Sequence, residues 1–237
     1  MMAALSAAKK ELRKHFKKVL KEISNENVKT QSAAIAKTLF TLPEYQNAKL
    51  ISVYLSMPTA EVQTAEIVRN ALNNGKRVFI PYYYKLKNPK RSQQSSTMDM
   101  LELESIQDYE GFEQDKWGIP TPSEDSIGKR LNCFGGLGKA EGEVGLVDGD
   151  EDVCLDLIVT PGLGFDRGLG RIGRGMGFYD NFFTRCSMHS EVRKKRVPFT
   201  VGLALNEQVL PSGQSVPMAG TDQKLQMLIL GDGSVVR

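Results

Sequence analysis

The chain has 237 residues, 41% of them hydrophobic and 25% charged, which suits one folded domain of α/β size. A net charge of +3 is too small to indicate nucleic-acid binding by itself, and no apolar run is long enough to cross a membrane. Three widely spaced cysteines and two histidines argue against a disulfide framework and a zinc site, so a reducing compartment is expected.

The first 40 residues are predicted to form two helices. Apolar residues recur at steps of three and four between positions 6 and 23, and basic residues occupy the other faces of this segment. A second helix is predicted from about position 26 to 40, before TLPEY. The basic start lacks the apolar centre of a secretory signal, so we expect a cytoplasmic protein, while a mitochondrial address stays open.

Six apolar runs have the length and the β-branched or aromatic content of strands. They are KLISVYLS (49–56), KRVFIP (76–81, ended by Pro81), TMDMLEL (97–103), DLIVT (156–160), FTVGLAL (199–205) and LQMLIL (225–230). Helices are predicted at 64–75 and 177–189. This alternation predicts an α/β fold, a single three-layer α/β/α domain around a mostly parallel, Rossmann-like sheet of about six strands.

Two segments are predicted to be mobile insertions within a single domain of residues 1–237. Segment 85–97 is polar and basic, and segment 123–152 is rich in glycine and charge without clear periodicity. The basic first helix and segment 85–97 leave an RNA-binding module as a remote alternative. Base-stacking aromatic residues interleaved with the basic ones are missing, which argues against it.

The segment PGLGFDRGLGRIGRGMGFYD, residues 161–180, is dense in glycine, and its second half contains the arginines Arg171 and Arg174. Positions 168–173 match the dinucleotide fingerprint G-x-G-x-x-G, but the preceding strand ends eight residues too early and a P-loop lysine is missing. Glycines still let backbone N–H groups approach an anion, and Arg171 and Arg174 suit phosphate or carboxylate. A backbone cradle for an anion and a disordered turn are the two alternatives.

This segment resembles the signature of the 5-formyltetrahydrofolate cyclo-ligase family, a strand followed by a PG-aF…G-RLGRG-GYYD pattern. Further matches follow in order along nearly the whole chain: AAKKELR, LSMPTAEVQT, VFIPYY, MDM, and VP with a later aspartate. The resemblance implies a fold like that of the NagB/RpiA/CoA-transferase group. It also implies ATP- and Mg²⁺-dependent conversion of 5-formyltetrahydrofolate to 5,10-methenyltetrahydrofolate, with phosphorylation of the formyl oxygen, attack by N10 and release of ADP and phosphate.

The resemblance assigns site residues one by one. ATP binding is carried over to Lys9, Arg13, Arg171, Gly173, Arg174, Gly175, Gly177, Phe178 and Tyr179. Arg174 and Tyr179 are carried over as catalytic, and Asp180 and Asp222 as Mg²⁺ ligands. Folate binding is carried over to Met57, Glu61, Tyr83, Trp117 and Phe178. Without the resemblance, Glu61 is as well suited to cap the next helix, and Trp117 to pack in the core.

The chain departs from the family pattern at three positions of the predicted site. Met176 stands where relatives often carry lysine or glycine, Phe178 replaces the first tyrosine of YYD, and Tyr82 stands where an arginine can occur. A different phosphate-handling enzyme, such as a sugar-phosphate isomerase or a CoA-transferase relative, is the alternative. That enzyme would use a carboxylate or lysine at a strand end and need no ATP. We expect a monomer that binds small molecules, and neither nucleic acid nor membrane.

Overall fold

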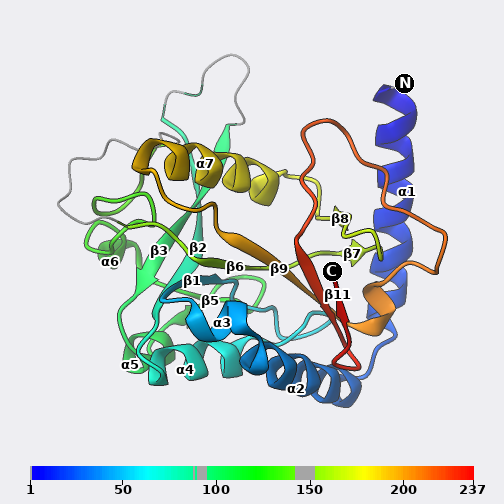
Figure 1. The fold of residues 1–237 in the computed structure, drawn as a ribbon, viewed down its shortest axis with the longest axis horizontal. Helices are drawn as coiled ribbons and strands as arrows, with labels where there is room; N and C mark the ends of the chain where they lie inside the picture. The colour runs from blue at the N-terminus through cyan, green and yellow to red at the C-terminus, as the bar shows by residue number, and fades with distance from the viewer. Residues whose placement is uncertain (1, 88, 90–94, 142–152) are drawn as a thin grey trace.

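A seven-stranded sheet lies at the centre of the computed structural model, which describes residues 2–87, 89, 95–141 and 153–237 (Figure 1). In spatial order the strands are β3 (Ser96–Leu103), β2 (Arg77–Lys85), β1 (Leu50–Val53), β6 (Leu157–Thr160), β9 (Phe199–Ala204), β10 (Met227–Leu230) and β11 (Val235–Val236). The five inner strands are parallel, and the edge strands β3 and β11 are antiparallel to their neighbours. The prediction of a mostly parallel sheet is confirmed, with seven strands instead of about six.

Helices cover both faces of the sheet, which gives the predicted three layers (Figure 1). Helices α2 (Asn25–Thr41), α3 (Pro43–Asn47) and α4 (Ala65–Asn73) lie on one face, and α7 (Phe178–Arg193) lies on the other. Strand β6 illustrates why, because side chains of successive strand residues point to opposite faces. Leu157 and Val159 pack in the core cluster of α2 and α4, whereas Ile158 packs in the cluster of α7.

Helix α1 (Met2–Lys21) stands at the side of the sheet, beside a hairpin of β7 (Gly164–Phe165) and β8 (Arg171–Ile172) (Figure 1). Its apolar stripe explains the position, because Phe16 and Leu20 are buried in the core cluster. The remaining elements are short: α5 (Ile106–Glu110), β4 (Glu113–Gln114), β5 (Pro120–Thr121), α6 (Glu124–Ile127) and the 3₁₀ turn η1 (Asn206–Gln208). No described helix is both long and apolar enough to span a membrane.

Strand β2 does not end at Pro81, as the sequence predicts, but continues to Lys85. Its pairing with β1 ends at Phe79, so the later part of the strand has only β3 as a partner. Proline lacks an N–H donor and is tolerated where one side of a strand is unpaired. The extension matters for the site because it includes Tyr83.

Most of the second predicted insertion is folded against the sheet, which differs from the mobile loop that its composition predicts. Between positions 123 and 141, α6 forms and residues such as Asn132 and Phe134 are buried. Asp99 of β3 holds this part, accepting from Asn132 Nδ2 at 3.1 Å and from Ala140 N at 2.7 Å. The predictions for 142–152, and for 88 and 90–94 of the first insertion, lie outside the described residues.

Candidate functional site

The predicted site residues gather at the carboxyl ends of the neighbouring parallel strands β1 and β6. After β1 the chain proceeds to β2 and β3 on one side of the sheet, and after β6 it proceeds to β9 and β10 on the other. Such a reversal separates the two loops that follow the strands, and open α/β sheets bind ligands at this point. The two loops here are residues 54–64 and the glycine-rich segment 161–177.

The glycine-rich segment is a hairpin followed by the start of a helix. Phe165 of β7 pairs with Arg171 of β8, and α7 begins after Gly177. Gly175 has a φ of 108°, which residues with a side chain rarely adopt. The first-turn N–H groups of α7 have no partner within the helix, and such groups bind anions in many proteins. The segment therefore has the form of a backbone cradle, not of a disordered turn.

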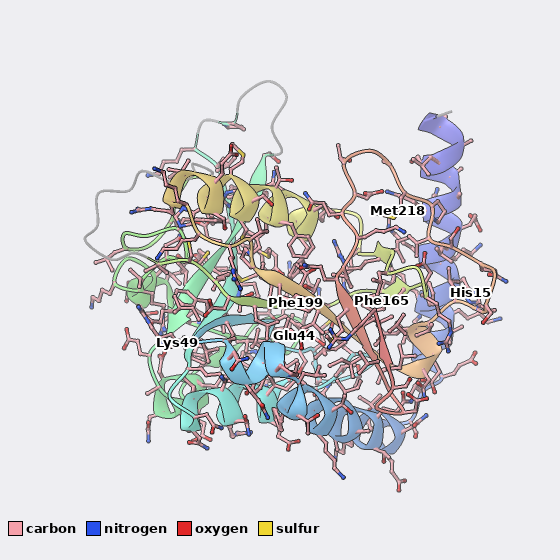
Figure 2. All side chains as sticks on the ribbon, viewed as in Figure 1. His15, Glu44, Lys49, Phe165, Phe199 and Met218 are labelled. Atoms are coloured by element: carbon pink, nitrogen blue, oxygen red, sulfur yellow. The ribbon has the colours of Figure 1, made fainter. Side chains whose placement is uncertain are left out.

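Helix α1 brings two cations to this segment. Lys9 forms an ion pair with Asp222, which lies on the loop before β10. Arg13 donates from Nε to the carbonyl oxygen of Gly173 over 2.9 Å. Figure 2 shows the same proximity, with the labelled Met218 of that loop near the helix that carries His15. Each of the two cations therefore already has a protein partner.

The two arginines of the cradle lie in different environments. The Arg171 side chain is buried, donates from Nη2 to Asp180 Oδ2 over 3.0 Å, and lies 5.5 Å from the centre of the Tyr179 ring. Arg174 is exposed, and its Nη2 lies 3.3 Å from Met57 Sδ in the loop after β1. Arg171 is thus buried and already paired with a carboxylate. Arg174 is exposed and extends from the cradle to the loop after β1.

Gln223 connects the two predicted metal ligands, and the sequence pattern did not single it out. Its backbone N–H donates to Asp180 Oδ1 over 3.1 Å, and Asp222 is its neighbour in the chain. Burial raises the pKa of Asp222, but hydrogen bonds from Lys9 and the Ala219 N–H outweigh it and hold that pKa below its usual value. The only available signal was the adjacency of Gln223 to Asp222.

The two carboxylates suit a Mg²⁺ ion that binds together with phosphate groups. Mg²⁺ prefers oxygen ligands and usually takes one or two carboxylates, with phosphate oxygens and waters completing the shell. Among the described residues, no group of three or more His, Cys, Asp or Glu side chains could hold a metal ion. Asp180 and Asp222 therefore fit a metal that is shared with a phosphate ligand.

Glu61 faces the cradle from the loop after β1. Its Oε2 accepts from the Met57 N–H at 2.9 Å, and burial raises its pKa, with this hydrogen bond and the Arg174 charge acting in the opposite direction. Helix α4 begins after Thr64, whose side chain makes no capping hydrogen bond, and the Glu61 carboxyl group bonds to Met57 instead. The alternative role of Glu61 as a helix cap is therefore wrong, and its carboxyl group remains available for a ligand.

Three aromatic residues, Tyr83, Trp117 and Phe178, were predicted to bind the same ligand as Glu61. Tyr83 is 47% exposed, and the centre of its ring lies 4.9 Å from that of Phe178. Its neighbour Tyr82 points to the other face of β2, where the hydroxyl donates to Glu124 Oε1 over 3.0 Å. Trp117 is 61% exposed, so the alternative of a core tryptophan is wrong.

Trp117 lies in the turn between β4 and β5, close to the loop after β1. A Cβ atom on its neighbour Gly118 would lie 2.9 Å from Pro58 Cγ, which places the two loops in contact. The Lys116 ammonium lies 4.2 Å from the centre of the indole ring. The exposed indole is therefore carried by a turn that packs on the loop of Met57 and Glu61.

Tyr179 is the buried aromatic residue of the cradle. Within the described part of the chain, its hydroxyl has no hydrogen-bond partner, although the side chain is only 6% exposed. Burial is the main cause that raises its pKa well above the usual value, so the phenol stays protonated at neutral pH. An unpaired buried hydroxyl is costly, and a ligand that accepts its hydrogen bond would remove that cost.

The structure thus brings the predicted residues together on two facing sides. We call the cradle with Lys9, Arg13, Asp180 and Asp222 the charged side, and we call the other group the aromatic side. The aromatic side consists of Met57, Glu61, Tyr83, Trp117 and Phe178. The two sides meet where Arg174 contacts Met57 and where Phe178 packs on Tyr83.

Known proteins resemble this chain over nearly its full length. The model of the 5-formyltetrahydrofolate cyclo-ligase family matches residues 5–231. A 5-formyltetrahydrofolate cyclo-ligase of Mus musculus is 34% identical over 98% of both chains. A probable 5-formyltetrahydrofolate cyclo-ligase of Schizosaccharomyces pombe is 31% identical over 95% of this chain and 96% of its own.

A solved structure shares the fold. The NMR structure of Aquifex aeolicus 5,10-methenyltetrahydrofolate synthetase superimposes with a TM-score of 0.60 and 23% identity. The match covers 97% of this chain and 92% of the other. At this identity the likeness supports the fold alone, and the family model carries the assignment.

Proposed function

The chain belongs to the 5-formyltetrahydrofolate cyclo-ligase family, and on this premise we propose that it converts 5-formyltetrahydrofolate to 5,10-methenyltetrahydrofolate with Mg²⁺ and ATP. The formyl oxygen attacks the γ-phosphorus of ATP, and ADP leaves. N10 then attacks the formyl carbon, loses its proton, and the C–O bond breaks as inorganic phosphate departs. ATP is needed because an unactivated formyl oxygen is a poor leaving group.

One observation carries the proposal: a phosphate-type cradle and a carboxyl group among aromatic rings face each other across one site. Arg174 Nη2 lies 3.3 Å from Met57 Sδ, which joins the two sides. A reaction between a nucleotide and a flat heterocycle needs both kinds of surface in contact, because positioning supplies a large part of the rate enhancement.

On the charged side, the N–H groups of the cradle and of the α7 first turn bind the ATP phosphates, with Gly173, Gly175 and Gly177 allowing close approach. Lys9, Arg13 and Arg171 supply charge. In the ligand-free state Lys9 pairs with Asp222, and Arg171 pairs with Asp180. Binding therefore requires an exchange, in which these cations turn to phosphate oxygens while the carboxylates become free to hold Mg²⁺.

The catalytic contacts come from Arg174 and Tyr179. Arg174, at the junction of the two sides, donates to the oxygens of the phosphoryl group in transfer and stabilises the charge that develops there. The buried Tyr179 hydroxyl donates a further hydrogen bond. Mg²⁺, when bound by Asp180 and Asp222, contributes neutralisation of phosphate charge.

On the aromatic side, Glu61 accepts hydrogen bonds from the N–H groups of the pterin. Tyr83, Trp117 and Phe178 stack on the flat rings, and Met57 fills the space beside them. Ionised Glu61 is the better acceptor, and the charge of Arg174 favours that form. Because Phe178 lacks the hydroxyl of the family tyrosine, its contribution is stacking alone.

The proposal is tested by incubating the protein with 5-formyltetrahydrofolate and Mg·ATP while recording methenyltetrahydrofolate absorbance and ADP. Product should form only when both ATP and Mg²⁺ are present, with one ADP per methenyl group. No product under any condition would overturn the function, and product without ATP would overturn the phosphorylation step. We further propose a cytoplasmic monomer without nucleic-acid or membrane partners, which size-exclusion chromatography and cell fractionation would check.

A further inference from the structure

Asp166 is a buried carboxylate to which the proposed mechanism assigns no contact with ATP or folate. It opens the turn between β7 and β8 and is only 4% exposed. Its Oδ1 accepts from the Gly170 N–H at 2.9 Å, and its Oδ2 accepts from the Val216 N–H at 2.7 Å. One carboxylate therefore joins two backbone segments that are far apart in the chain.

Both segments are connected to the proposed metal ligands, one through an ion pair and the other along the chain. Gly170 precedes Arg171, which pairs with Asp180. Val216 begins the stretch that ends in Asp222, whose Oδ2 accepts from the Ala219 N–H at 2.5 Å. At the other end of this stretch, the Leu225 N–H donates to the Leu169 carbonyl oxygen over 3.0 Å. The loop that carries Asp222 is thus fastened at both ends to the hairpin turn that carries Asp166.

The fit around Asp166 is specific for a carboxylate of this length. A Cβ atom on Gly170 would lie 2.5 Å from Asp166 Oδ2, so glycine is required there for the close approach. Each carboxylate oxygen accepts from a different N–H group. Asparagine has the same shape but only one acceptor atom, and its NH₂ group would face one of the two N–H donors.

We propose that Asp166 is a positioning residue that sets the separation of Asp180 and Asp222, and so the affinity for the metal–nucleotide complex. This inference rests on the proposed function, because it takes those two aspartates as the metal ligands. Groups that orient metal ligands without touching the metal change metal affinity by about 10- to 100-fold when they are altered. Asp166 acts through the backbone N–H groups of Gly170 and Val216, and it is not among the residues that the resemblance assigned to the site.

The test compares Asp166→Asn with the unsubstituted protein in two binding measurements. Mn²⁺ with a non-hydrolysable ATP analogue is titrated by electron paramagnetic resonance. Binding of 5-formyltetrahydrofolate is followed by the fluorescence of Trp117, the only tryptophan in the sequence. We expect Mn²⁺–nucleotide affinity to fall about 10-fold or more, and folate affinity to change less than about 2-fold.

Asp156→Asn is the matched control. Asp156 also accepts two backbone N–H groups, from Lys49 at 2.8 Å and Leu50 at 2.9 Å, but at the opposite end of β1. It should leave both affinities unchanged. If Asp166→Asn weakens the binding of nucleotide and folate equally, or leaves nucleotide affinity unchanged, this inference is overturned. The proposed function is not affected by either result. If the unsubstituted chain binds no nucleotide, the proposed function fails and this inference falls with it.

Hydrogen exchange in the unsubstituted protein decides the matter if Asp166→Asn does not fold. The amides of Gly170 and Val216 should exchange slowly before any ligand is added, because both donate to Asp166. Added Mn²⁺–nucleotide should slow exchange further in the segment 216–225. Rapid exchange at Val216 without ligand, or no change in that segment on binding, overturns the inference.

Discussion

The charged side and the aromatic side of the site differ in whether their side chains are already paired within the protein or are free to contact a ligand. On the charged side, Asp222 is paired with Lys9, and Asp180 is paired with Arg171. On the aromatic side, Trp117 and Tyr83 are 61% and 47% exposed. A nucleotide with its metal must therefore replace existing ion pairs, whereas a flat ring need only cover exposed aromatic surface.

The two sides also differ in the direction in which they shift a carboxyl pKa. Burial raises the pKa of Glu61, while Lys9 and the Ala219 N–H hold the pKa of Asp222 below its usual value despite burial. Glu61 therefore favours folding at low pH, and Asp222 favours folding at higher pH.

Arg174→Ala should give the largest effect, because Arg174 lies where the two sides meet. Loss of a group that stabilises transition-state charge typically costs about 100- to 1,000-fold in rate. We expect kcat/KM for ATP to fall by this amount in steady-state assays. Arg167→Ala, at an exposed position of the same hairpin turn, is the control and should behave like the unsubstituted enzyme. Unchanged kinetics for Arg174→Ala would show that the cradle is wrongly assigned.

Lys9→Met tests the exchange of ion pairs on the charged side. The variant should bind Mg·ATP about 10- to 100-fold more weakly, because a charge-assisted contact to phosphate is lost. Mn²⁺ alone should bind about 5-fold more tightly, because Asp222 is no longer occupied by an ammonium group. Titration by electron paramagnetic resonance with and without nucleotide measures both affinities.

The neighbouring exposed Lys10 provides the matched control for that exchange. Lys10→Met removes the same charge one position along α1 and should change neither affinity appreciably. If Lys9→Met weakens the binding of Mn²⁺ alone, the ion pair does not compete with the metal. Lys9 would then support the metal site, and only the Arg171–Asp180 pair would have to be replaced by a ligand.

The sequence singled out the residues that form these ion pairs, but it did not predict the pairs themselves. The glycine-rich motif is local, so its glycines, its arginines and the start of α7 could be predicted from neighbouring residues, whereas the β7–β8 hairpin was not predicted. The partners Lys9 and Asp222 are 213 positions apart, and only the folded chain brings them together. Arg171 likewise belongs to the predicted cradle, but its burial against the rings of Tyr179 and Phe183 depends on tertiary packing.

In the fold as well, some elements follow from neighbouring residues, and others are fixed only by contacts with residues far away in the chain. Runs of Val, Ile and Leu predicted the six longer strands and the parallel sheet. Val235–Val236 was missed because two residues carry no periodicity, and its pairing with β10 decides its conformation. The segment 123–141 has no local pattern, yet Asp99 of β3 orders part of it through Asn132 and Ala140. Only the folded sheet supplies that anchor.

Glu61→Gln tests the aromatic side through the pH dependence of the protein's stability. Because the pKa of Glu61 is raised above 4.5, its contribution to stability is present below that pH and is lost as pH rises through the folded-state pKa. Glutamine does not ionise, so the variant should have a higher Tm than the unsubstituted protein at pH 7, and not at pH 4. Folate affinity should fall about 10-fold as charge-assisted acceptors are lost.

Asp222→Asn is the counterpart on the charged side. The pKa of Asp222 is lowered from 3.8, so its contribution to stability is present above that value and is lost as pH falls through the folded-state pKa. This variant should therefore have a lower Tm than the unsubstituted protein at pH 7, and the two Tm values should converge in acid. Shifts of the same sign for Glu61→Gln and Asp222→Asn would contradict the electrostatic difference between the two sides.

Trp117→Ala should have the smallest effect, because a stacking surface that is already exposed contributes only to binding. Stacking of a flat ring on one aromatic side chain is worth about 1–3 kcal/mol. Because Tyr83 and Phe178 remain in the variant, we expect the lower end of this range, and KM for 5-formyltetrahydrofolate should rise about 5-fold. The Tm should hardly change, since the indole is 61% exposed. Trp117→Phe keeps a ring and should restore most of the affinity. A lowered Tm with unchanged KM would instead make the tryptophan a structural residue, and the aromatic side would lose its most exposed ring.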